Sequence, residues 1–279
     1  MSRIRLRHAT NYVKVIAATG FWCAAFLLQG CASGPPIDTR YHSRSQDSRV
    51  QFLVFHYTEG DLPRALDVLT NGEVSSHYLV AVDPPVIYRL VDENRRAYHA
   101  GLSRWRSNSN LNAASIGIEI VNSGCSSQSG QLVCAEYPQR QIDQVILLAQ
   151  DIVRRHGIRT DHIVGHADIA PQRKIDPGPR FPWKMLADAG VGRWPNEAIF
   201  RQRLPLYQTT LPDVGWFQQK LASYGYQVAT DGILDTQTGN VIAAFQMHFR
   251  PSDVSGKPDA ETAALLDSLT ESEGLEQAY

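Results

Sequence analysis

The segment VGHADIAPQRKIDPGP, residues 164–179, brings a histidine, a lysine, an arginine and two aspartates close together. Its three prolines disfavour a regular helix or a central strand, so we expect a loop. Because loops tolerate sequence variation, a dense group of ionisable residues on one suggests a functional site. The alternative is a solvated loop in which His166, Lys174 and Asp176 have no special role.

His166 and Asp176 carry side chains that bind metal ions. A catalytic zinc site needs three protein ligands and leaves one position open for water. His56, near the end of the run VQFLVFHY, which is otherwise almost entirely apolar and aromatic, is the candidate for the third ligand. A lone histidine at a strand end is most often structural. In an α/β domain, however, strand ends converge, and His56 would then meet the loop that carries the other two.

Two further residues suit the chemistry of such a site. In IGIEI, Glu119 lies on the strand face opposite to the isoleucines, where a carboxylate is costly unless it is paired or used. Near zinc it would take a proton from the metal-bound water and pass it to a leaving nitrogen. Lys174 would stabilise the oxyanion that forms at the attacked carbonyl. Alternatively, Lys174 is an ordinary surface charge.

Apolar runs and helical spacing predict the elements that position these residues. We expect strands in VQFLVFHYT, SHYLVAVD, VIYRLVD, ASIGIEIVN and DHIVGH, and helices in PRALDVLTNG and RQIDQVILLAQDIVRRHG. His156-Gly157 is a plausible end for the second helix. Together these elements indicate an α/β domain over residues 48–195.

After this domain, the alternation of strands and helices gives way to helical stretches alone. Three short helical stretches, WFQQKLASYGY, TGNVIAAFQMHF and DAETAALLDSLT, predict a small helical domain over residues 205–272. DGILDTQTGNVIAAF and SGKPDAETAALL share a glycine, then an acidic residue, then a threonine before an apolar helix. This half-repeat indicates duplicated turn-helix units.

The N-terminal residues have the pattern of an export signal. A basic start precedes an apolar run over residues 15–28, which is shorter than the roughly 20 residues of a membrane-spanning helix. We therefore expect residues 1–30 to be a signal peptide; a buried N-terminal helix is the alternative. Their removal takes away four positive charges and no negative ones, which shifts the formal net charge from −1 to −5. Such a chain has no basic footprint for nucleic acid.

The junction LLQGC resembles the lipobox of bacterial lipoproteins. The resemblance implies that Cys31 is acylated and becomes the mature N-terminus, with residues 31–47 as a polar tether. Ala32 follows it instead of aspartate, which implies a periplasmic protein anchored to the outer membrane. In that oxidising compartment, Cys125 and Cys134 are more plausibly a disulfide than a metal pair.

The motifs FHYT, SSHYLV, YHAG, IGIEI and GHADIAPQRKIDPGP together resemble the amidase-2 family of N-acetylmuramoyl-L-alanine amidases over residues 48–195. The resemblance implies a mixed central sheet flanked by helices and a Zn²⁺ cofactor. It also implies hydrolysis of the amide bond between N-acetylmuramic acid, normal or 1,6-anhydro, and L-alanine in peptidoglycan.

Residue by residue, the resemblance assigns a role to each candidate. Zinc falls to His56, His166 and Asp176. Glu119 becomes the catalytic acid and base, and Lys174 the transition-state stabiliser. Tyr57 and Thr58 would line the substrate groove. A zinc D,D-carboxypeptidase is a weaker alternative, because His77 and Asp83 are one residue too close for its ligand motif.

The C-terminal segment resembles a three-helix peptidoglycan-binding domain; a helical cap on the first domain is the alternative. A non-catalytic peptidoglycan-binding lipoprotein remains a second hypothesis, which the complete ligand set disfavours. We expect peptidoglycan or muropeptides and the outer membrane as partners, no nucleic acid, and a monomer. The sequence leaves open the preference for anhydro or normal muramic acid and the tolerated stem-peptide length.

Overall fold

The structure is a computed structural model of the whole chain that describes residues 35, 37–129 and 131–276. The predicted signal peptide and lipid-anchored Cys31 lie outside the described residues. Residues 46–279 cluster as one unit, to which the elements below belong. No helix among the described residues is long and apolar enough to cross a bilayer.

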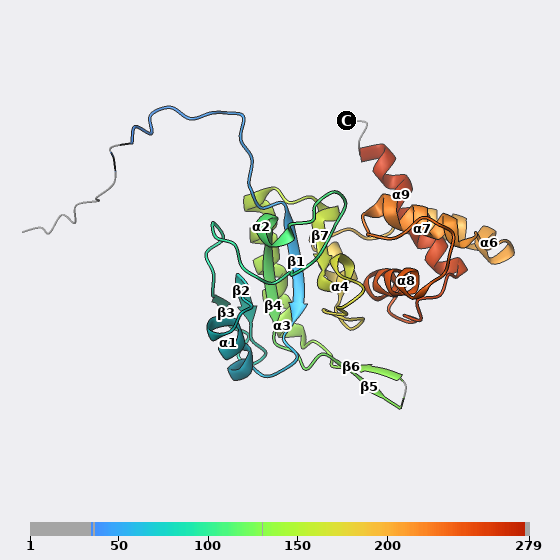
Figure 1. Cartoon of the computed structure of the whole chain (residues 1–279), viewed down its shortest axis with the longest axis horizontal. Coiled ribbons are helices and arrows are strands. Elements are labelled where there is room, and N and C mark those ends of the chain that lie inside the picture. The colour runs from blue at the N-terminus through green and yellow to red at the C-terminus, as the bar shows by residue number, and fades with distance from the viewer. Residues whose placement is uncertain (1–34, 36, 130, 277–279) are drawn as a thin grey trace, which may run out of the picture. The chain divides into compact units, whose positions relative to one another are not determined.

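A mixed sheet forms the centre of the first domain (Figure 1). Within the described residues it has five strands in the order β3-β2-β4-β1-β7. Its neighbouring strands are parallel except β2 and β3, which pair antiparallel. The strands are β1 (Phe52–Tyr57), β2 (Tyr78–Val80), β3 (Ile87–Arg89), β4 (Ser115–Ile120) and β7 (Ile163–Gly165). The predicted α/β class with a mixed sheet is confirmed.

Helix α3 (Gln139–His156) packs on the sheet through a stripe of buried residues at helical spacing. The members of this stripe are Ile142, Val145, Ala149 and Ile152. The helix ends at Gly157, whose φ of 65° lies in the left-handed region that glycine adopts without steric cost. The helix and its C-cap were both predicted from the sequence. Helix α1 (Leu62–Asn71) begins after Asp61, whose side chain accepts a hydrogen bond from the Arg64 backbone.

The segment from residue 164 was expected to be a loop that follows the short strand DHIVGH. That strand is confirmed as β7, which ends at Gly165, but residues His166–Ile169 form the one-turn helix α4, which was not predicted. The prolines did not prevent this because Pro171, Pro177 and Pro179 all follow the helix. The remainder of the segment consists of turns and irregular backbone.

Several short elements were not predicted. These are α2 (Leu111–Ala114), the hairpin of β5 (Cys125–Gln128) and β6 (Gln131–Cys134), the 3₁₀ turn Thr160–His162, α5 (Trp183–Asp188) and α6 (Glu197–Thr209). Helix α6 contains Pro205, which removes one backbone donor and disfavours a helix in a sequence reading. No residue of α6 is buried, so its freed carbonyl can be hydrated.

The C-terminal helices α7 (Val214–Tyr224), α8 (Thr236–Phe249) and α9 (Ala260–Glu276) repeat one local arrangement. The buried side chain of Gln218 in α7 bonds to the Gly232 backbone N–H and to the Ile233 carbonyl. Gln246 in α8 makes the same two bonds, to Gly256 and Lys257. In each unit an aspartate caps the next helix. The half-repeat of the sequence therefore corresponds to two equivalent turn-helix units.

The C-terminal helices share a core with the first domain. One apolar cluster contains Val54 and Trp105 from the first domain together with Phe217 and Phe245 from the helices. Deeper in the contact, the buried Asp168 of α4 accepts hydrogen bonds from Tyr226 Oη at 2.6 Å and from His248 Nδ1 at 2.8 Å. The two domains are thus joined directly behind the helix that begins at His166.

Candidate metal centre and catalytic pocket

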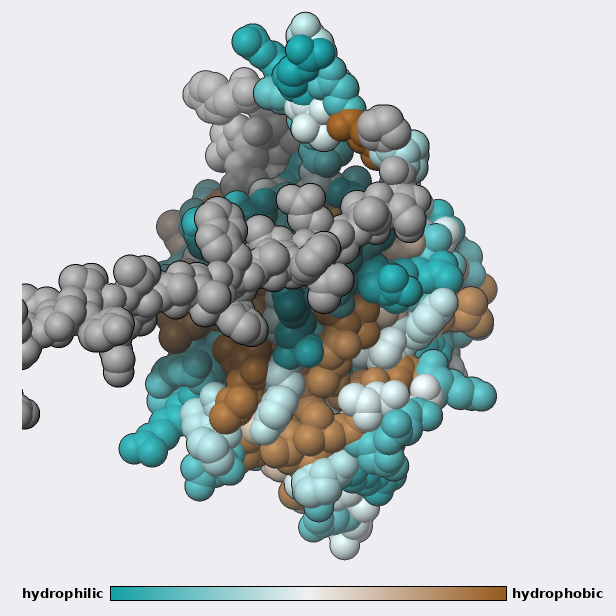
Figure 2. All heavy atoms as spheres, turned by 90° about the vertical axis from the view of Figure 1, so that its left-hand side faces the viewer, coloured by the Kyte–Doolittle hydropathy of each residue, from teal (hydrophilic) through white to brown (hydrophobic). Residues whose placement is uncertain are grey.

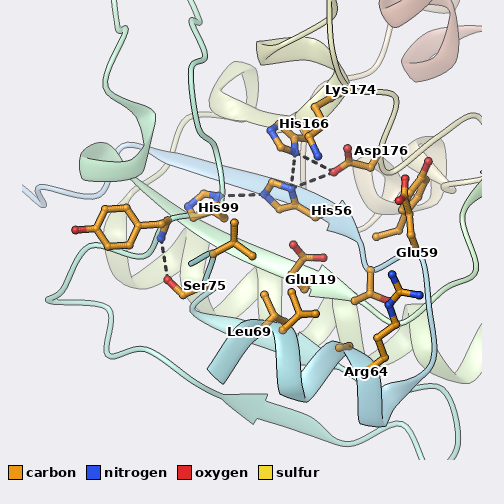
Figure 3. Close-up of a pocket in the computed structure, with 16 residues that line it drawn as sticks. His56, Glu59, Arg64, Leu69, Ser75, His99, Glu119, His166, Lys174 and Asp176 are labelled. Atoms are coloured by element: carbon orange, nitrogen blue, oxygen red, sulfur yellow. Dashed lines mark hydrogen bonds and ion pairs between the residues drawn. The ribbon is translucent and has the colours of Figure 1, made fainter. Parts of the chain in front are cut away.

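Parallel strands bring the candidate metal ligands to one end of the sheet. His56 is the fifth residue of β1, and β7 leads into His166 at the first position of α4. The segment after α4 folds back and brings Asp176 beside His166, where the Ala167 backbone N–H donates a hydrogen bond to the Asp176 carbonyl. All three side chains are buried and lie together (Figure 3). The structure thus brings together the three residues that the sequence proposed as ligands.

Three atoms of these side chains form a near-equilateral triangle. Nδ1 of His56 lies 3.0 Å from Nδ1 of His166, and each lies 3.1 Å from Oδ2 of Asp176. Ligands about 2.0–2.1 Å from one tetrahedral Zn²⁺ would lie about 3.3–3.4 Å apart, so the spacing is close to that of a zinc site.

The Nε2 atoms of His56 and His166 point away from the triangle, and each lies at hydrogen-bond distance from a group that determines whether that nitrogen carries the proton. Nε2 of His166 lies 3.2 Å from the Ala100 carbonyl, which only accepts hydrogen bonds, and 3.3 Å from Nη2 of Arg173. Because both protons of that arginine nitrogen go to the carbonyls of Ala100 and Leu102, Nε2 of His166 donates to Ala100. Nε2 of His56 lies 3.0 Å from Nδ1 of His99.

His99 is a functional candidate to which no role was assigned from the sequence. Its Nε2 lies 3.1 Å from Oγ of Ser115, whose hydroxyl donates to the Leu111 carbonyl. Because that carbonyl cannot donate, Ser115 accepts from His99, and His99 in turn accepts from Nε2–H of His56. This chain of hydrogen bonds leaves Nδ1 of His56 without a proton, so its lone pair is available to a metal ion.

With both Nε2 atoms protonated, the triangle consists of two nitrogen lone pairs and one carboxylate oxygen. Such a set repels itself unless a cation lies among its atoms. The donor set therefore fits a divalent metal ion.

The environment lowers the pKa values of two of the ligands, His56 and Asp176. Burial, and then the nearby His166, lower the pKa of His56 to about 4, so the ring is neutral at pH 7. Burial alone would raise the pKa of Asp176, but the charge and hydrogen bonds of His166 and His56 hold it below its usual value. Neutral imidazole and ionised carboxylate are the forms that bind metal.

Glu119 lies beside the ligand group. On the adjacent parallel strand it pairs in register with His56, so both side chains point to the same face of the sheet. Its Oε2 is buried and makes no hydrogen bond with the described residues. Burial, followed by the charge of Asp176, raises the pKa of Glu119 well above its ordinary value. A carboxyl group with a raised pKa suits proton transfer near neutral pH.

The ligand group and Glu119 line a pocket of about 180 Å³. Lys174, Tyr57 and Thr58, the other residues that the sequence proposed for this site, also line it. Tyr57 is only 6% exposed, so most of its ring packs inside the protein. Glu59, also in the lining, has a φ of 52° in the left-handed region, a strained conformation of the kind found at functional sites.

Helix α1 forms the wall across the pocket from the ligands (Figure 3). It contributes Arg64 together with Ala65, Val68 and Leu69, and Tyr98 adds an aromatic edge. In Figure 2, apolar residues form a continuous area among hydrophilic ones on one face of the molecule. Val68 and Tyr98, at 42% and 50% exposure, give the pocket an exposed apolar rim.

The β5–β6 hairpin flanks the ligand loop. Cys125 and Cys134 form a disulfide at its base, where they are paired residues of the two strands. A Cβ atom added to Gly178 would lie 3.0 Å from the Cys125 sulfur. The disulfide therefore packs tightly against the loop two residues beyond Asp176.

The domain is an α/β fold built on a mixed sheet. One of its pockets holds a His–His–Asp group and a buried glutamate, which is the arrangement expected of a metal-dependent hydrolase. The family model for N-acetylmuramoyl-L-alanine amidase matches residues 46–179, and the model for a peptidoglycan binding domain matches residues 210–266. The chain belongs to the N-acetylmuramoyl-L-alanine amidase family.

Individual relatives agree with this membership. The chain is 42% identical to N-acetylmuramoyl-L-alanine amidase AmiD of Escherichia coli, over 91% of this chain and 98% of that protein. The solved complex of AmiD from E. coli with anhydro-N-acetylmuramic acid-L-Ala-D-gamma-Glu-L-Lys gives a TM-score of 0.78 at 42% identity, covering 85% of this chain and 95% of that one. AmpDh3 of Pseudomonas aeruginosa with anhydromuramic pentapeptide gives 0.80 at 37% identity, covering 85% and 98%.

Proposed function

We propose that the protein hydrolyses the amide bond between muramic acid and L-alanine in peptidoglycan fragments, with 1,6-anhydro-muramyl peptides among its substrates. The convergence of His56, His166 and Asp176 beside the unpaired carboxyl of Glu119 carries this proposal. The anhydro-muramyl peptides in the complexes of AmiD and AmpDh3 support the substrate class.

The three ligands would hold Zn²⁺, the ion that a His₂-carboxylate set binds in other hydrolases. When bound, the ion would polarise the scissile carbonyl and lower the pKa of a water molecule. Zinc is our assignment for the ion, supported by the neutral nitrogens and the spacing of the donor atoms.

Glu119 would take a proton from the attacking water and deliver it to the leaving nitrogen of L-alanine. Its place in register beside His56, and a buried Oε2 that has no hydrogen-bond partner among the described residues, support this role. Lys174 would place its ammonium at the oxygen of the attacked carbonyl and stabilise the charge that develops there. Tyr57, Thr58 and the apolar wall of α1 would position the lactyl and alanyl groups.

The test is hydrolysis of a defined anhydro-muramyl tripeptide, with release of free peptide followed by mass spectrometry. We expect activity that a chelator removes and Zn²⁺ restores. His166→Ala should lose both metal and activity, because two ligands hold the ion poorly. Full zinc occupancy in His166→Ala would contradict the ligand set, and substrate binding without cleavage would favour a non-catalytic peptidoglycan-binding protein.

We further propose that the protein is a periplasmic lipoprotein held at the outer membrane through Cys31. The basic and apolar residues before LLQGC support this. Metabolic labelling with a fatty acid should modify the wild type and leave Cys31→Ala unmodified. Labelled Cys31→Ala that still fractionates with membranes would show that the anchor lies elsewhere.

A further inference from the structure

A second cavity, larger than the catalytic pocket, lies between the two matched domains. Its volume is about 760 Å³, against about 180 Å³ for the catalytic pocket. One wall comes from the amidase domain, through residues 102–104, 109 and 169–173. The other wall comes from residues 227–229, 237 and 241, within the segment matched by the peptidoglycan binding model. We call this cavity the inter-domain groove.

Direct hydrogen bonds hold the walls of the inter-domain groove together. Gln172 donates from Nε2 to the Gln237 carbonyl at 3.0 Å and accepts from Asn240 Nδ2 at 2.9 Å. The Arg106 backbone N–H donates to the Gly225 carbonyl at 2.8 Å. Because the domains also share an apolar core, the groove is a preformed feature of the fold.

The lining of the groove suits a polar ligand that carries no positive charge. None of its lining residues is acidic. Neutral side chains such as Ser103, Gln227 and Gln237 offer hydroxyl and amide groups, and Ile169 and Val241 offer aliphatic surface. Amides and hydroxyls pair with the acetamido and hydroxyl groups of N-acetylated sugars, and aliphatic side chains cover the methyl and C–H groups.

Two arginines add positive charge to this neutral lining. Arg173 donates to the carbonyls of Leu102 and Ala100, so much of its guanidinium is already engaged. Arg104 is exposed and donates from Nε to the Arg106 carbonyl. Its two terminal nitrogens have no hydrogen bond or ion pair with the residues that the structure describes. Arg104 is therefore available to bind a carboxylate through two hydrogen bonds.

The proposed reaction produces such a carboxylate on the sugar strand. Hydrolysis breaks the lactyl C–N bond, adds the water oxygen to the carbonyl carbon, and releases the peptide with its amino group carrying the proton. The muramyl lactyl group is left as a free carboxylate. The groove and the catalytic pocket border the same segment, because Arg173 lines the groove and the following residue, Lys174, lines the catalytic pocket.

We propose that the inter-domain groove binds the glycan strand of peptidoglycan, with Arg104 pairing with a muramyl carboxylate exposed by peptide removal. That the carboxylate is produced by this protein rests on the proposed function. Binding of the glycan strand in the groove does not depend on it. No aromatic side chain is among the lining residues, so each sugar is held weakly and affinity increases with strand length.

The experiment measures binding of glycan strands freed of peptide to the full chain by calorimetry. Because these strands lack the scissile amide, binding is measured without turnover. Ala229→Trp, which fills the groove from an exposed position, and Arg104→Gln should each weaken binding about 10-fold or more. The matched control Arg140→Gln changes an exposed arginine on α3 that does not line the groove, and should bind like the wild type.

Neutral N-acetylglucosamine oligomers of equal length test the charge. The wild type should bind them more weakly than the acidic strands, and Arg104→Gln should reduce that difference while Ala229→Trp weakens both. Unchanged binding of acidic strands by both variants would overturn the proposal.

Hydrolysis of the small anhydro-muramyl tripeptide separates this proposal from the proposed function. Both groove variants should cleave it at the wild-type rate, and a parallel loss in both would show that the groove belongs to the catalytic pocket. A wild type that binds strands in the groove but cleaves no muramyl peptide would refute the proposed function alone.

Discussion

Nε2 of His56 is held 3.0 Å from Nδ1 of His99, in a chain of hydrogen bonds that ends at the Leu111 carbonyl. Burial, and then the neighbouring His56, keep the pKa of His99 well below its ordinary value, so His99 is a neutral acceptor at pH 7. Gly117 permits this arrangement, since a Cβ there would lie 2.5 Å from the His99 ring. His99 thus fixes the ring and tautomer of His56.

Replacing His99 by phenylalanine should therefore weaken metal binding. The Nε2–H of His56 would lose its acceptor, and loss of such an outer partner typically costs about 10–100-fold in affinity. Competition with a chromophoric chelator measures the affinity for Zn²⁺. His77→Phe is the control: His77 is also buried and packs edge-on against His99, but its hydrogen bonds go to the Arg95 carbonyl and the Gly117 backbone and not to a ligand. The aromatic replacement keeps that packing, so it should change thermal stability only. Equal zinc affinity in His99→Phe and the wild type would contradict the role.

Glu119→Gln should keep the metal and lose turnover. The amide preserves the shape of the side chain but no longer exchanges a proton, and general acid–base groups contribute about 10²–10⁴-fold. Zinc content and kcat, measured on the same preparation, separate the two effects. Turnover near the wild-type value at neutral pH would remove Glu119 from proton transfer.

Lys174→Met should also retain the metal and lower kcat, by about 10²–10³-fold, as expected for the loss of one oxyanion donor. The methionine keeps the length of the side chain but removes its charge. KM should change less than kcat, because the ammonium acts on charge that develops in the transition state. A rise in KM with unchanged kcat would instead make Lys174 a substrate-binding residue.

Elements with strong periodicity were predictable from the sequence. The apolar run over 50–55 gave the buried strand β1, and the spacing of α3 gave a helix with its C-cap. The two-residue period of a strand was enough to place Glu119 on the face opposite to the isoleucines of its own strand. The pairing of Glu119 with His56 on the neighbouring strand is a long-range property, which the sequence could only imply through the family resemblance.

The features that escaped prediction depend on contacts between distant segments. His99 lies outside any periodic element, and its role arises from side chains 43 and 16 residues away. In the sequence, Asp168 could not be told apart from the other charged residues of its segment. Its role follows from the hydrogen bonds that it accepts from Tyr226 and His248 of the C-terminal domain. Local propensity does not contain such relationships, because tertiary packing decides them.

The acid stability of the protein should depend on Glu93. Two bonds from Arg155, followed by those from Tyr78 and His156, lower the pKa of Glu93 from 4.5 to about 2 against the effect of burial. The folded state therefore binds fewer protons than the unfolded state between these values. The stabilisation is complete above pH about 4.5 and is lost as the pH falls towards 2.

Glu93→Gln should consequently lower the free energy of unfolding at pH 7 by about 1–2 kcal/mol, allowing for solvent screening. It should also flatten the dependence of stability on pH between 4.5 and 2. Urea titrations across this range measure both effects. Glu73→Gln, at an exposed carboxylate, should leave the profile unchanged. A Glu93→Gln profile as steep as that of the wild type would assign the acid sensitivity to other groups.

The disulfide between Cys125 and Cys134 should stabilise the hairpin without affecting the metal. It closes a loop with a sequence separation of 9, for which the chain-entropy model gives about 2–3 kcal/mol. The double variant Cys125→Ser/Cys134→Ser should lose about that much unfolding free energy and keep its zinc affinity, because neither sulfur contacts a ligand atom. KM should rise modestly, since the Cys125 sulfur and the Tyr57 ring both border the space beside Gly178, so loss of the disulfide would loosen the packing around Tyr57. Thiol titration under denaturing conditions, on protein prepared without reductant, should find neither cysteine reactive, and two reactive thiols at these positions would exclude the bond.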